Sequence, residues 1–258
     1  MEFIRACDDL AGAVRDAVAG MVGTPEAGEY VKMGADGTPT KKIDQVAEDI
    51  VVDYFTHHPF CRRLISEELG CAEMGGESGT IFLDPIDGTY NAVVGIPFYA
   101  ISIAYAEDGV VQAGYVQNLA TGETFHAVRG EGAYLDGRVI HVSKVSLLEK
   151  SAMSVYGRKF DPTRVLGINQ KIRRWRLLGA SALELCYVGC GRIDGFIDVR
   201  GTLRVTDAAA GMLVCEEAGG RISDLDGNTL TFPDEVSVGR SLVATNSIVH
   251  NKVIEYLR

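Results

Sequence analysis

Acidic residues in three separate segments of the sequence have the types and spacing of metal ligands. Glu67 and Glu68 are adjacent, Asp84 and Asp87 flank a Pro-Ile pair, and Asp207 lies near the C-terminus. Mg²⁺ prefers oxygen ligands in an octahedron and is usually held by a few carboxylates, water and a phosphate group. Two such ions can activate water and steady the leaving oxygen of a phosphoryl transfer. The residues could therefore support this chemistry if the fold brings the three segments together.

Residues 84–89, which read DPIDGT, have the composition that such a site needs. Asp84 stands where an apolar strand is expected to end, and the second aspartate can face the same ion. The Ile86 carbonyl could add a neutral oxygen, Gly88 allows the backbone to approach a phosphate, and Thr89 offers a hydroxyl and an amide. The same letters are also typical of an ordinary turn, and paired glutamates usually lie on a solvated face. Each segment alone therefore leaves the simpler interpretation open.

Three motifs in order, ISEELG, LDPIDGTYN and TDAAAG, resemble those of the inositol monophosphatase superfamily. Members carry a Glu-Glu pair, a D-P-[ILV]-D-G-[ST]-x-N motif and a late aspartate that opens a helix. The resemblance covers most of the chain and is closest to the archaeal bifunctional class that acts on fructose 1,6-bisphosphate and inositol monophosphates. It implies a hydrolase of phosphoric monoesters that uses two or three Mg²⁺ ions, with Mn²⁺ or Zn²⁺ as possible substitutes. The late motif has Thr-Asp where animal relatives commonly have Trp-Asp, but the aspartate is present.

The resemblance also implies roles for individual residues. Ligands for two ions would be Glu67, Asp84 and the Ile86 carbonyl for the first, and Asp84, Asp87 and Asp207 for the second. The residues that orient the attacking water or the ligands would be Glu67, Glu68, Asp44 and Thr89. Residues 34–40 (GADGTPT) are predicted to form a mobile loop that contains Asp36, the acidic candidate for contact with a third ion, and Thr40. Asp44 could equally be an ordinary polar position on a helix.

Further residues match positions that contact the substrate. These are Asp87, Gly88 and Thr89 at the phosphate, and Arg176, Ser181, Asp198 and Arg200 at the rest of the substrate. An arginine is usually a solvated surface charge, so Arg176 and Arg200 could also be unrelated to the site. Arg173 and Arg174 add positive charge nearby, and the planar fork of arginine can bond two phosphate oxygens. These arginines favour a bisphosphate, fructose 1,6-bisphosphate, as the substrate.

Other functions remain open at this stage. A dedicated inositol monophosphatase or an adenosine 3′,5′-bisphosphate nucleotidase would use the same metal motifs. A catalytically silent regulatory binding protein is disfavoured, because Glu67, Asp84, Asp87 and Asp207 are all present.

Apolar periodicity predicts the elements that must position these side chains. Steps of three and four predict helices over 2–21 and about 43–55. Short apolar runs predict strands that end at Glu67 and at Asp84, where Pro85 should break the second strand. Residues 98–145 alternate in the manner of an antiparallel sheet with a turn at 108–109. Strands and helices then alternate, with strands at 153–157, 195–199 and 242–246 and helices at 181–191, 205–218 and 248–257.

These patterns alone indicate a mixed α and β chain, whereas the resemblance implies a layered αβαβα sandwich of the sugar phosphatase type. A soft boundary near 145–150 separates an N-terminal half, 1–148, with the metal motifs from a C-terminal half, 149–258, with the substrate residues. We expect the two halves to form one compact body.

Composition excludes several kinds of partner. The chain has 258 residues and a formal net charge of −10, which makes it a poor non-specific binder of nucleic acid. Its six cysteines include no C-x-x-C pair and no zinc-finger spacing. No signal peptide or membrane-spanning run of about 20 apolar residues is recognisable, so we expect a cytoplasmic protein without a membrane partner. The expected partners are a small-molecule phosphate ester and, from the resemblance, a second copy in a homodimer.

Overall fold

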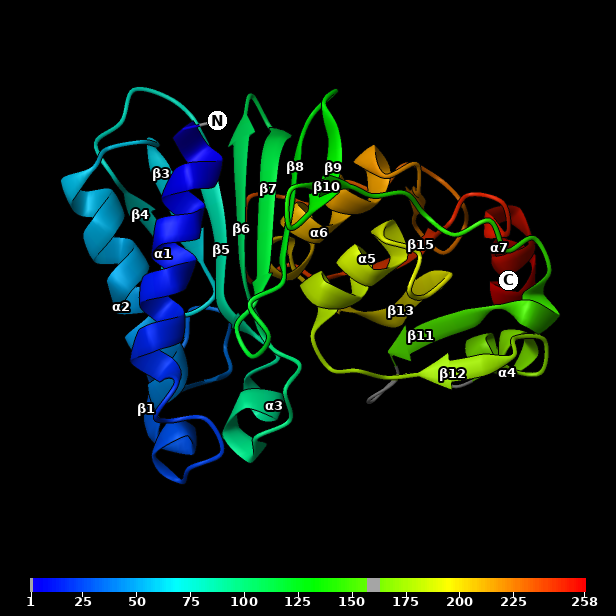
Figure 1. Cartoon of the computed structure of the whole chain (residues 1–258), viewed down its shortest axis with the longest axis horizontal. Helices are drawn as coiled ribbons and strands as arrows, with labels where there is room; N and C mark the ends of the chain where they lie inside the picture. Colours follow the sequence, from blue (N-terminus) through cyan, green and yellow to red (C-terminus); the bar gives the residue numbers. More distant parts are fainter. Residues whose placement is uncertain (1, 157–162) are drawn as a thin grey trace.

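The computed structural model describes residues 2–156 and 163–258, which form stacked layers of helix and sheet (Figure 1). The outermost layer on the N-terminal side consists of α1 (Glu2–Val18) and α2 (Lys42–His57), which pack on one face of an eight-stranded sheet. Both helices were predicted, although α1 ends three residues earlier than its apolar pattern. In the described part of the chain, no helix is long and apolar enough to cross a membrane.

The other layers come from the second half of the chain. Helices α5 (Ser181–Gly189) and α6 (Val205–Glu217) lie between the eight-stranded sheet and a five-stranded sheet. Helices α4 (Thr163–Asn169) and α7 (His250–Leu257) cover the far face of the second sheet. The order is αβαβα, which confirms the fold that the resemblance implied.

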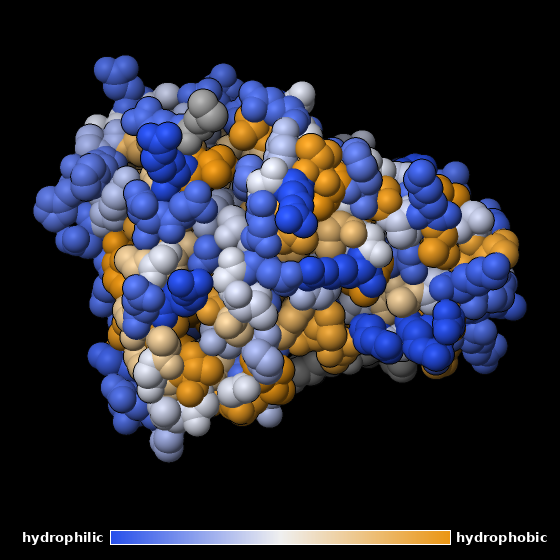
Figure 2. Space-filling view, in the orientation of Figure 1, coloured by the Kyte–Doolittle hydropathy of each residue, from blue (hydrophilic) through white to orange (hydrophobic). Residues whose placement is uncertain are grey.

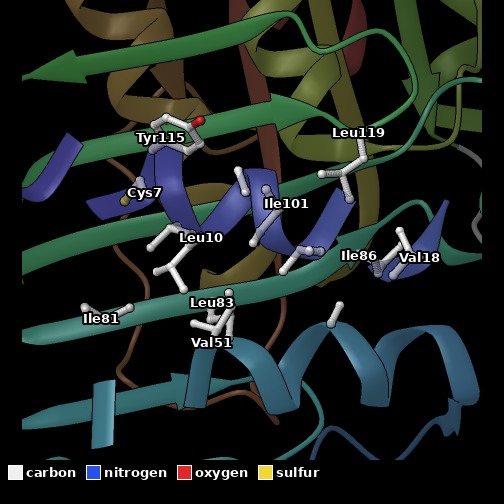
Figure 3. Close-up of a cluster of buried hydrophobic side chains, with 14 of the residues drawn as sticks. Cys7, Leu10, Val18, Val51, Ile81, Leu83, Ile86, Ile101, Tyr115 and Leu119 are labelled. Atoms are coloured by element: carbon white, nitrogen blue, oxygen red, sulfur yellow. The ribbon is translucent and has the colours of Figure 1, made fainter. Parts of the chain in front are cut away.

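A continuous apolar core joins α1 and α2 to the first sheet (Figure 3). Each helix contributes the residues that recur at steps of three and four, and the sheet contributes alternate residues of its central strands. The labelled side chains of this core are Cys7, Leu10, Val18, Val51, Ile81, Leu83, Ile86, Ile101, Tyr115 and Leu119. Because Ile86 belongs to both this core and the 84–89 motif, core packing fixes the backbone of that motif.

The first sheet is antiparallel except where β3 and β5 run parallel. In order across the sheet, the strands are β10 (Arg138–Val139), β9 (Gly132–Leu135), β8 (Thr124–Val128), β7 (Val110–Asn118), β6 (Ala100–Glu107), β5 (Thr80–Asp87), β3 (Arg63–Ser66) and β4 (Gly70–Glu73). The turn between β6 and β7 has positive φ at both Asp108 (49°) and Gly109 (75°). Such a turn matches the twist of a hairpin, as predicted.

Two local predictions are wrong in their bounds. Strand β5 does not end at Asp84 but continues to Asp87. Its pairing with β6 is irregular between these two residues, so no hydrogen bond of the sheet is lost where Pro85 lacks an N–H. The predicted loop 34–40 is largely the turn of a hairpin formed by β1 (Tyr30–Met33) and β2 (Pro39–Lys41), so Thr40 lies in a strand and is buried.

The second sheet has the order β12 (Arg174–Arg176), β11 (Ala152–Tyr156), β13 (Gly195–Leu203), β15 (Arg240–Thr245) and β14 (Arg221–Ser223). Its predicted strands and flanking helices are present, and Gly157 of the first predicted strand lies outside the described residues. Short helices lie at Glu26–Gly28, Thr89–Val94 (α3) and Leu148–Lys150.

Against the second sheet, the buried His250 of α7 is hydrogen-bonded through both ring nitrogens, to Ser223 (2.9 Å) and Thr245 (3.0 Å).

Candidate active site

A cavity of about 500 Å³ lies where the first sheet meets the middle helices and the second sheet. The end of β5 and the start of α3 supply one wall. The start of α5, the last residues of β13 and the start of α6 supply much of the rest, and the 34–38 turn, Tyr156 of β11 and residues of the 236–239 segment complete the lining. Most of the residues predicted to act on a phosphate ester line it: Asp36, Glu67, Asp84, Ile86, Asp87, Gly88, Thr89, Ser181, Arg200 and Asp207.

Three carboxylates converge in this cavity. One oxygen from each of Glu67, Asp84 and Asp207 lies within 4.8 Å of the others. Burial raises the pKa of Asp84 well above its usual range, and the neighbouring acidic groups, Glu67 first, raise it further. Burial likewise raises the pKa of Glu67, against the lowering effect of Arg204. Buried carboxylates that repel one another are stabilised by a cation, so this donor set fits a divalent metal ion.

Two aspartates of the site hold the same position in their helices. Asp44 and Asp207 are the third residues of α2 and α6, and each accepts a hydrogen bond from the backbone N–H of the residue before its helix, at 3.1 Å and 2.9 Å. This bond satisfies a free N–H and fixes the carboxylate at the helix start. The prediction that the late aspartate opens a helix is confirmed.

Thr89 joins Asp44 to the 84–89 segment. Its hydroxyl lies 2.9 Å from Asp44 Oδ1 and 3.0 Å from the Ile86 carbonyl oxygen. A hydroxyl has one hydrogen to donate, so it serves one of these acceptors at a time. Burial, and then the charge of Glu68, raise the pKa of Asp44 to about 7. Asp44 therefore contacts the site through Thr89 rather than lying on the solvent face of α2.

Glu68 and the 34–38 turn lie beside the carboxylate cluster. Glu68 accepts a hydrogen bond from the buried Thr40 hydroxyl, and burial raises its pKa. Asp36 is tied into its turn by the Thr38 N–H (2.8 Å) and hydroxyl (2.7 Å). The turn is docked on the Glu-Glu backbone, since the Asp36 N–H donates to the Glu67 carbonyl (3.3 Å).

Asp87 connects the two halves of the chain. Its carboxylate accepts backbone N–H bonds from Ser181 (2.8 Å), Ala182 (2.7 Å) and Leu183 (3.4 Å) at the start of α5. Burial, followed by the charge of Asp207, raises its pKa to about 8. Asp87 is thus the N-terminal cap of a helix that lies far away in sequence. Ser181 enters the site through its backbone N–H.

Gly88 occupies a position that only glycine fits without strain. Its φ is +90°, in the left-handed region, and a Cβ there would lie 3.0 Å from the Ala180 Cβ and 3.0 Å from the Gly179 carbonyl oxygen. The close approach of the 84–89 segment to the start of α5 therefore depends on this glycine.

The structure separates the two predicted substrate arginines. Arg200 lines the cavity, donates to Asp198 through Nη2 (2.6 Å) and Nε (3.0 Å), and lies 3.9 Å above the Tyr156 ring. Asp198 is fully buried, anchors Arg200 and does not line the cavity itself, so its nearness to substrate hydroxyls stays a prediction. Arg176 is exposed at the edge strand β12, where it donates to the Trp175 carbonyl (2.9 Å), and it lies outside the lining of the cavity.

Several residues of the cavity were missed by the sequence analysis, among them residues of the 236–239 segment and two side chains that hold other groups of the site. Tyr156 supplies the ring beneath Arg200. Arg204, the residue before α6, places its guanidinium among the carboxylates, with Nη2 at 2.7 Å from Glu67 and 3.1 Å from Asp207. A basic residue three positions before the late aspartate is the only signal that could have indicated Arg204.

Comparison with known proteins agrees with this geometry. The model of the inositol monophosphatase family matches residues 4–258. The chain belongs to this family. It is 43% identical to the fructose-1,6-bisphosphatase/inositol-1-monophosphatase of Methanothermobacter thermautotrophicus, over 96% of this chain and 94% of that protein. It is 37% identical to the protein of that name from Archaeoglobus fulgidus, over 100% of this chain and 98% of the relative.

Other relatives extend this comparison. A bifunctional NADP phosphatase/NAD kinase of Methanococcus maripaludis is 33% identical over 98% of this chain, which spans 49% of that protein. A solved inositol monophosphatase-fructose 1,6-bisphosphatase superposes with a TM-score of 0.91 at 29% identity and 100% coverage of both chains. A Thermotoga maritima IMPase gives 0.84 at 28% identity, over 100% of this chain and 97% of that one. This member of the inositol monophosphatase family is a phosphoric monoester hydrolase.

Proposed function

We propose that the protein hydrolyses fructose 1,6-bisphosphate to fructose 6-phosphate, and inositol monophosphates to inositol, with Mg²⁺ as cofactor. The observation that carries the proposal is the convergence of Glu67, Asp84 and Asp207 within 4.8 Å in a cavity that Arg200 also borders. The three carboxylates would bind the cations that contact the reacting phosphoryl group, and Arg200 would bind a second phosphate of the substrate.

The donor set is made of hard oxygen atoms, which Mg²⁺ prefers over other ligand types. Glu67, Asp84, Asp207 and the Ile86 carbonyl would hold the ions, and Asp87 could join them through lone pairs that its bonds to α5 leave free. Bound ions of this kind neutralise phosphoryl charge and lower the pKa of water.

The chain's own groups would position the reactants. We assign the phosphate to the backbone at Gly88 and Thr89, where glycine permits close approach. A water that attacks phosphorus would form a new P–O bond while the bond to the sugar oxygen breaks, and the leaving sugar oxygen would take a proton from solvent. The Thr89 hydroxyl would orient the attacking water and accept its proton while giving its own to Asp44, which lies 2.9 Å away.

Arg200 supports the choice of a bisphosphate. Two hydrogen bonds to Asp198 and the face of Tyr156 hold its guanidinium plane at the cavity wall. A guanidinium fixed in this way loses little conformational entropy when it bonds a phosphate. Arg176 would contribute less, because it is exposed and lies outside the cavity lining.

The test is phosphate release with Mg²⁺ from fructose 1,6-bisphosphate, inositol 1-phosphate, adenosine 3′,5′-bisphosphate and NADP, each with an EDTA control. NADP is included because two relatives are bifunctional NADP phosphatase/NAD kinases. We expect the first two substrates to be hydrolysed and EDTA to stop both reactions. If only adenosine 3′,5′-bisphosphate or NADP is hydrolysed, the assignment of the metal site stands and the assignment of the substrate is wrong.

We further propose that the protein forms a homodimer. Large apolar side chains are exposed on and just after α3, namely Tyr90 (74%), Val94 (48%) and Ile96 (45%). Figure 2 shows hydrophobic surface over this region. Multi-angle light scattering should give twice the 27.8 kDa chain mass, and a monomer mass would contradict the proposal.

A further inference from the structure

The guanidinium of Arg204 occupies the centre of the acidic cluster. Its Nη2 forms an ion pair with Glu67 (2.7 Å) and donates to Asp207 (3.1 Å), its Nε donates to the second oxygen of Asp207 (3.1 Å), and its Nη1 is bonded to Asp36. The side chain is only 19% exposed. One cation thus bridges carboxylates from three segments of the chain: the 34–38 turn, the end of β3 and the start of α6.

Two of these carboxylates belong to the group that could hold a metal ion. Glu67 and Asp207 form that group together with Asp84. The lone pairs with which Glu67 and Asp207 contact the guanidinium are therefore not free to coordinate a metal ion at the position that the guanidinium occupies. A divalent cation in the cluster would also repel the arginine, since both are positively charged.

Asp36 extends this network to the 34–38 turn. Its carboxylate holds the turn through Thr38 and bonds Arg204, while the backbone of the turn is docked on Glu67 and Glu68. Gly34 lies close to Glu68, where an added Cβ would be 2.5 Å from Oε2. Because Arg204 is bonded to Asp36, a movement of the Arg204 side chain would release one of the bonds that hold this turn.

We propose that Arg204 is a tethered cation that competes with the divalent metal for Glu67 and Asp207, and that couples metal occupancy to the 34–38 turn through Asp36. The inference rests on the metal site of the proposed function. In the metal-free protein, Arg204 neutralises part of the acidic cluster and holds the turn. When metal binds, the guanidinium withdraws from Glu67 and Asp207, and Asp36 loses its partner.

The test is metal binding without substrate. Mn²⁺ serves as the probe, because carboxylate sites accept it and free Mn²⁺ can be measured by electron paramagnetic resonance. Arg204→Gln removes the charge, and we expect it to bind Mn²⁺ about tenfold more tightly or better, since charge-assisted bonds no longer oppose the metal. Arg204→Lys keeps a cation and should remain nearer the wild-type affinity. Arg200→Gln is the matched control, because Arg200 borders the same cavity but pairs with Asp198, and it should change the affinity less than twofold.

A second readout follows the turn. Hydrogen exchange at residues 34–38 should speed up when Mg²⁺ is added to the wild type, and should be fast in Arg204→Gln with or without Mg²⁺. Unchanged or weaker Mn²⁺ binding in Arg204→Gln would overturn the competition, and would indicate that Arg204 supports the ligands. If neither wild type nor variant binds Mn²⁺ or Mg²⁺, the metal site of the proposed function fails as well.

Discussion

Replacing Asp84 by asparagine should make the metal-free protein more stable and abolish its activity. Asp84 is 2% exposed, and its carboxylate lies within 4.8 Å of those of Glu67 and Asp207. Asparagine has nearly the same shape but no charge. Its side-chain oxygen can still accept the Ile86 N–H bond that Asp84 accepts at 3.1 Å. The substitution therefore removes charge repulsion with little change in packing.

The magnitude follows from Coulomb's law. Two unit charges no more than 4.8 Å apart repel by about 3.5 kcal/mol or more at an effective dielectric constant of about 20. Asp84 repels two neighbours, but the variant also loses attraction to Arg204, and proton uptake already relieves part of the repulsion because the pKa of Asp84 is raised. We therefore expect a net gain of about 1–3 kcal/mol in the free energy of unfolding in EDTA.

Magnesium should reverse this order of stability. A ligand at one hundred times its Kd stabilises the folded protein by about 2.7 kcal/mol, which raises Tm by about 5–10 °C for a chain of this size. The wild type should show this shift and Asp84→Asn should not. Scanning calorimetry in EDTA and in Mg²⁺ measures both effects, with Asp16→Asn on the exposed face of α1 as the control that should behave like wild type. An Asp84→Asn variant that is less stable in EDTA and keeps the Mg²⁺ shift would refute the reasoning.

Three further predictions test the surrounding structure. Gly88→Ala should lower the free energy of unfolding by about 1–3 kcal/mol in urea titrations, because φ is +90° and the Cβ has no room; an unchanged midpoint would show that the segment relaxes freely. Arg200→Ala should lower kcat/KM for fructose 1,6-bisphosphate about 10- to 100-fold and affect inositol 1-phosphate much less, whereas Arg176→Ala should have a small effect on both; equal losses on the two substrates would remove the bisphosphate argument. Burial lowers the pKa of His250 to about 4, while an unfolded histidine titrates near about 6.5, so the unfolded chain binds more protons between these values. Stability should therefore fall by up to about 3 kcal/mol as the pH drops from about 6.5 to 4, and His250→Asn should lack this component; equal pH slopes for both proteins would contradict it.

The sequence was informative where a local pattern determines the geometry. Periodic apolar residues predicted α1, α2, α5 and α6, and the late aspartate was correctly placed at a helix start. The 84–89 motif and Glu67 of the Glu-Glu pair do meet Asp207 in one cavity. Pro85 misled the strand prediction because the interrupted pairing with β6 makes a missing N–H harmless.

The contacts that no local pattern reveals are those between distant segments. Asp87 bonds the start of α5, more than 90 residues later in the chain, and the Thr40 hydroxyl bonds Glu68 across 28 residues. Arg204 had the appearance of any surface arginine until the ends of β3 and β5 and the start of α6 were placed together. Arg176 and Arg200 likewise differ only in position, since one lies at a sheet edge and the other is held by Asp198 at the cavity.

The most direct test of the central claim is phosphate release from fructose 1,6-bisphosphate by wild type and Asp84→Asn. The reaction is followed in Mg²⁺, after addition of EDTA, and after Mg²⁺ is restored in excess. We predict that the wild type is active, stops in EDTA and recovers, and that Asp84→Asn releases no phosphate in any of the three conditions. Release that persists in EDTA, or near-normal activity of Asp84→Asn, would contradict the assignment of the carboxylate cluster as a metal-dependent phosphatase centre.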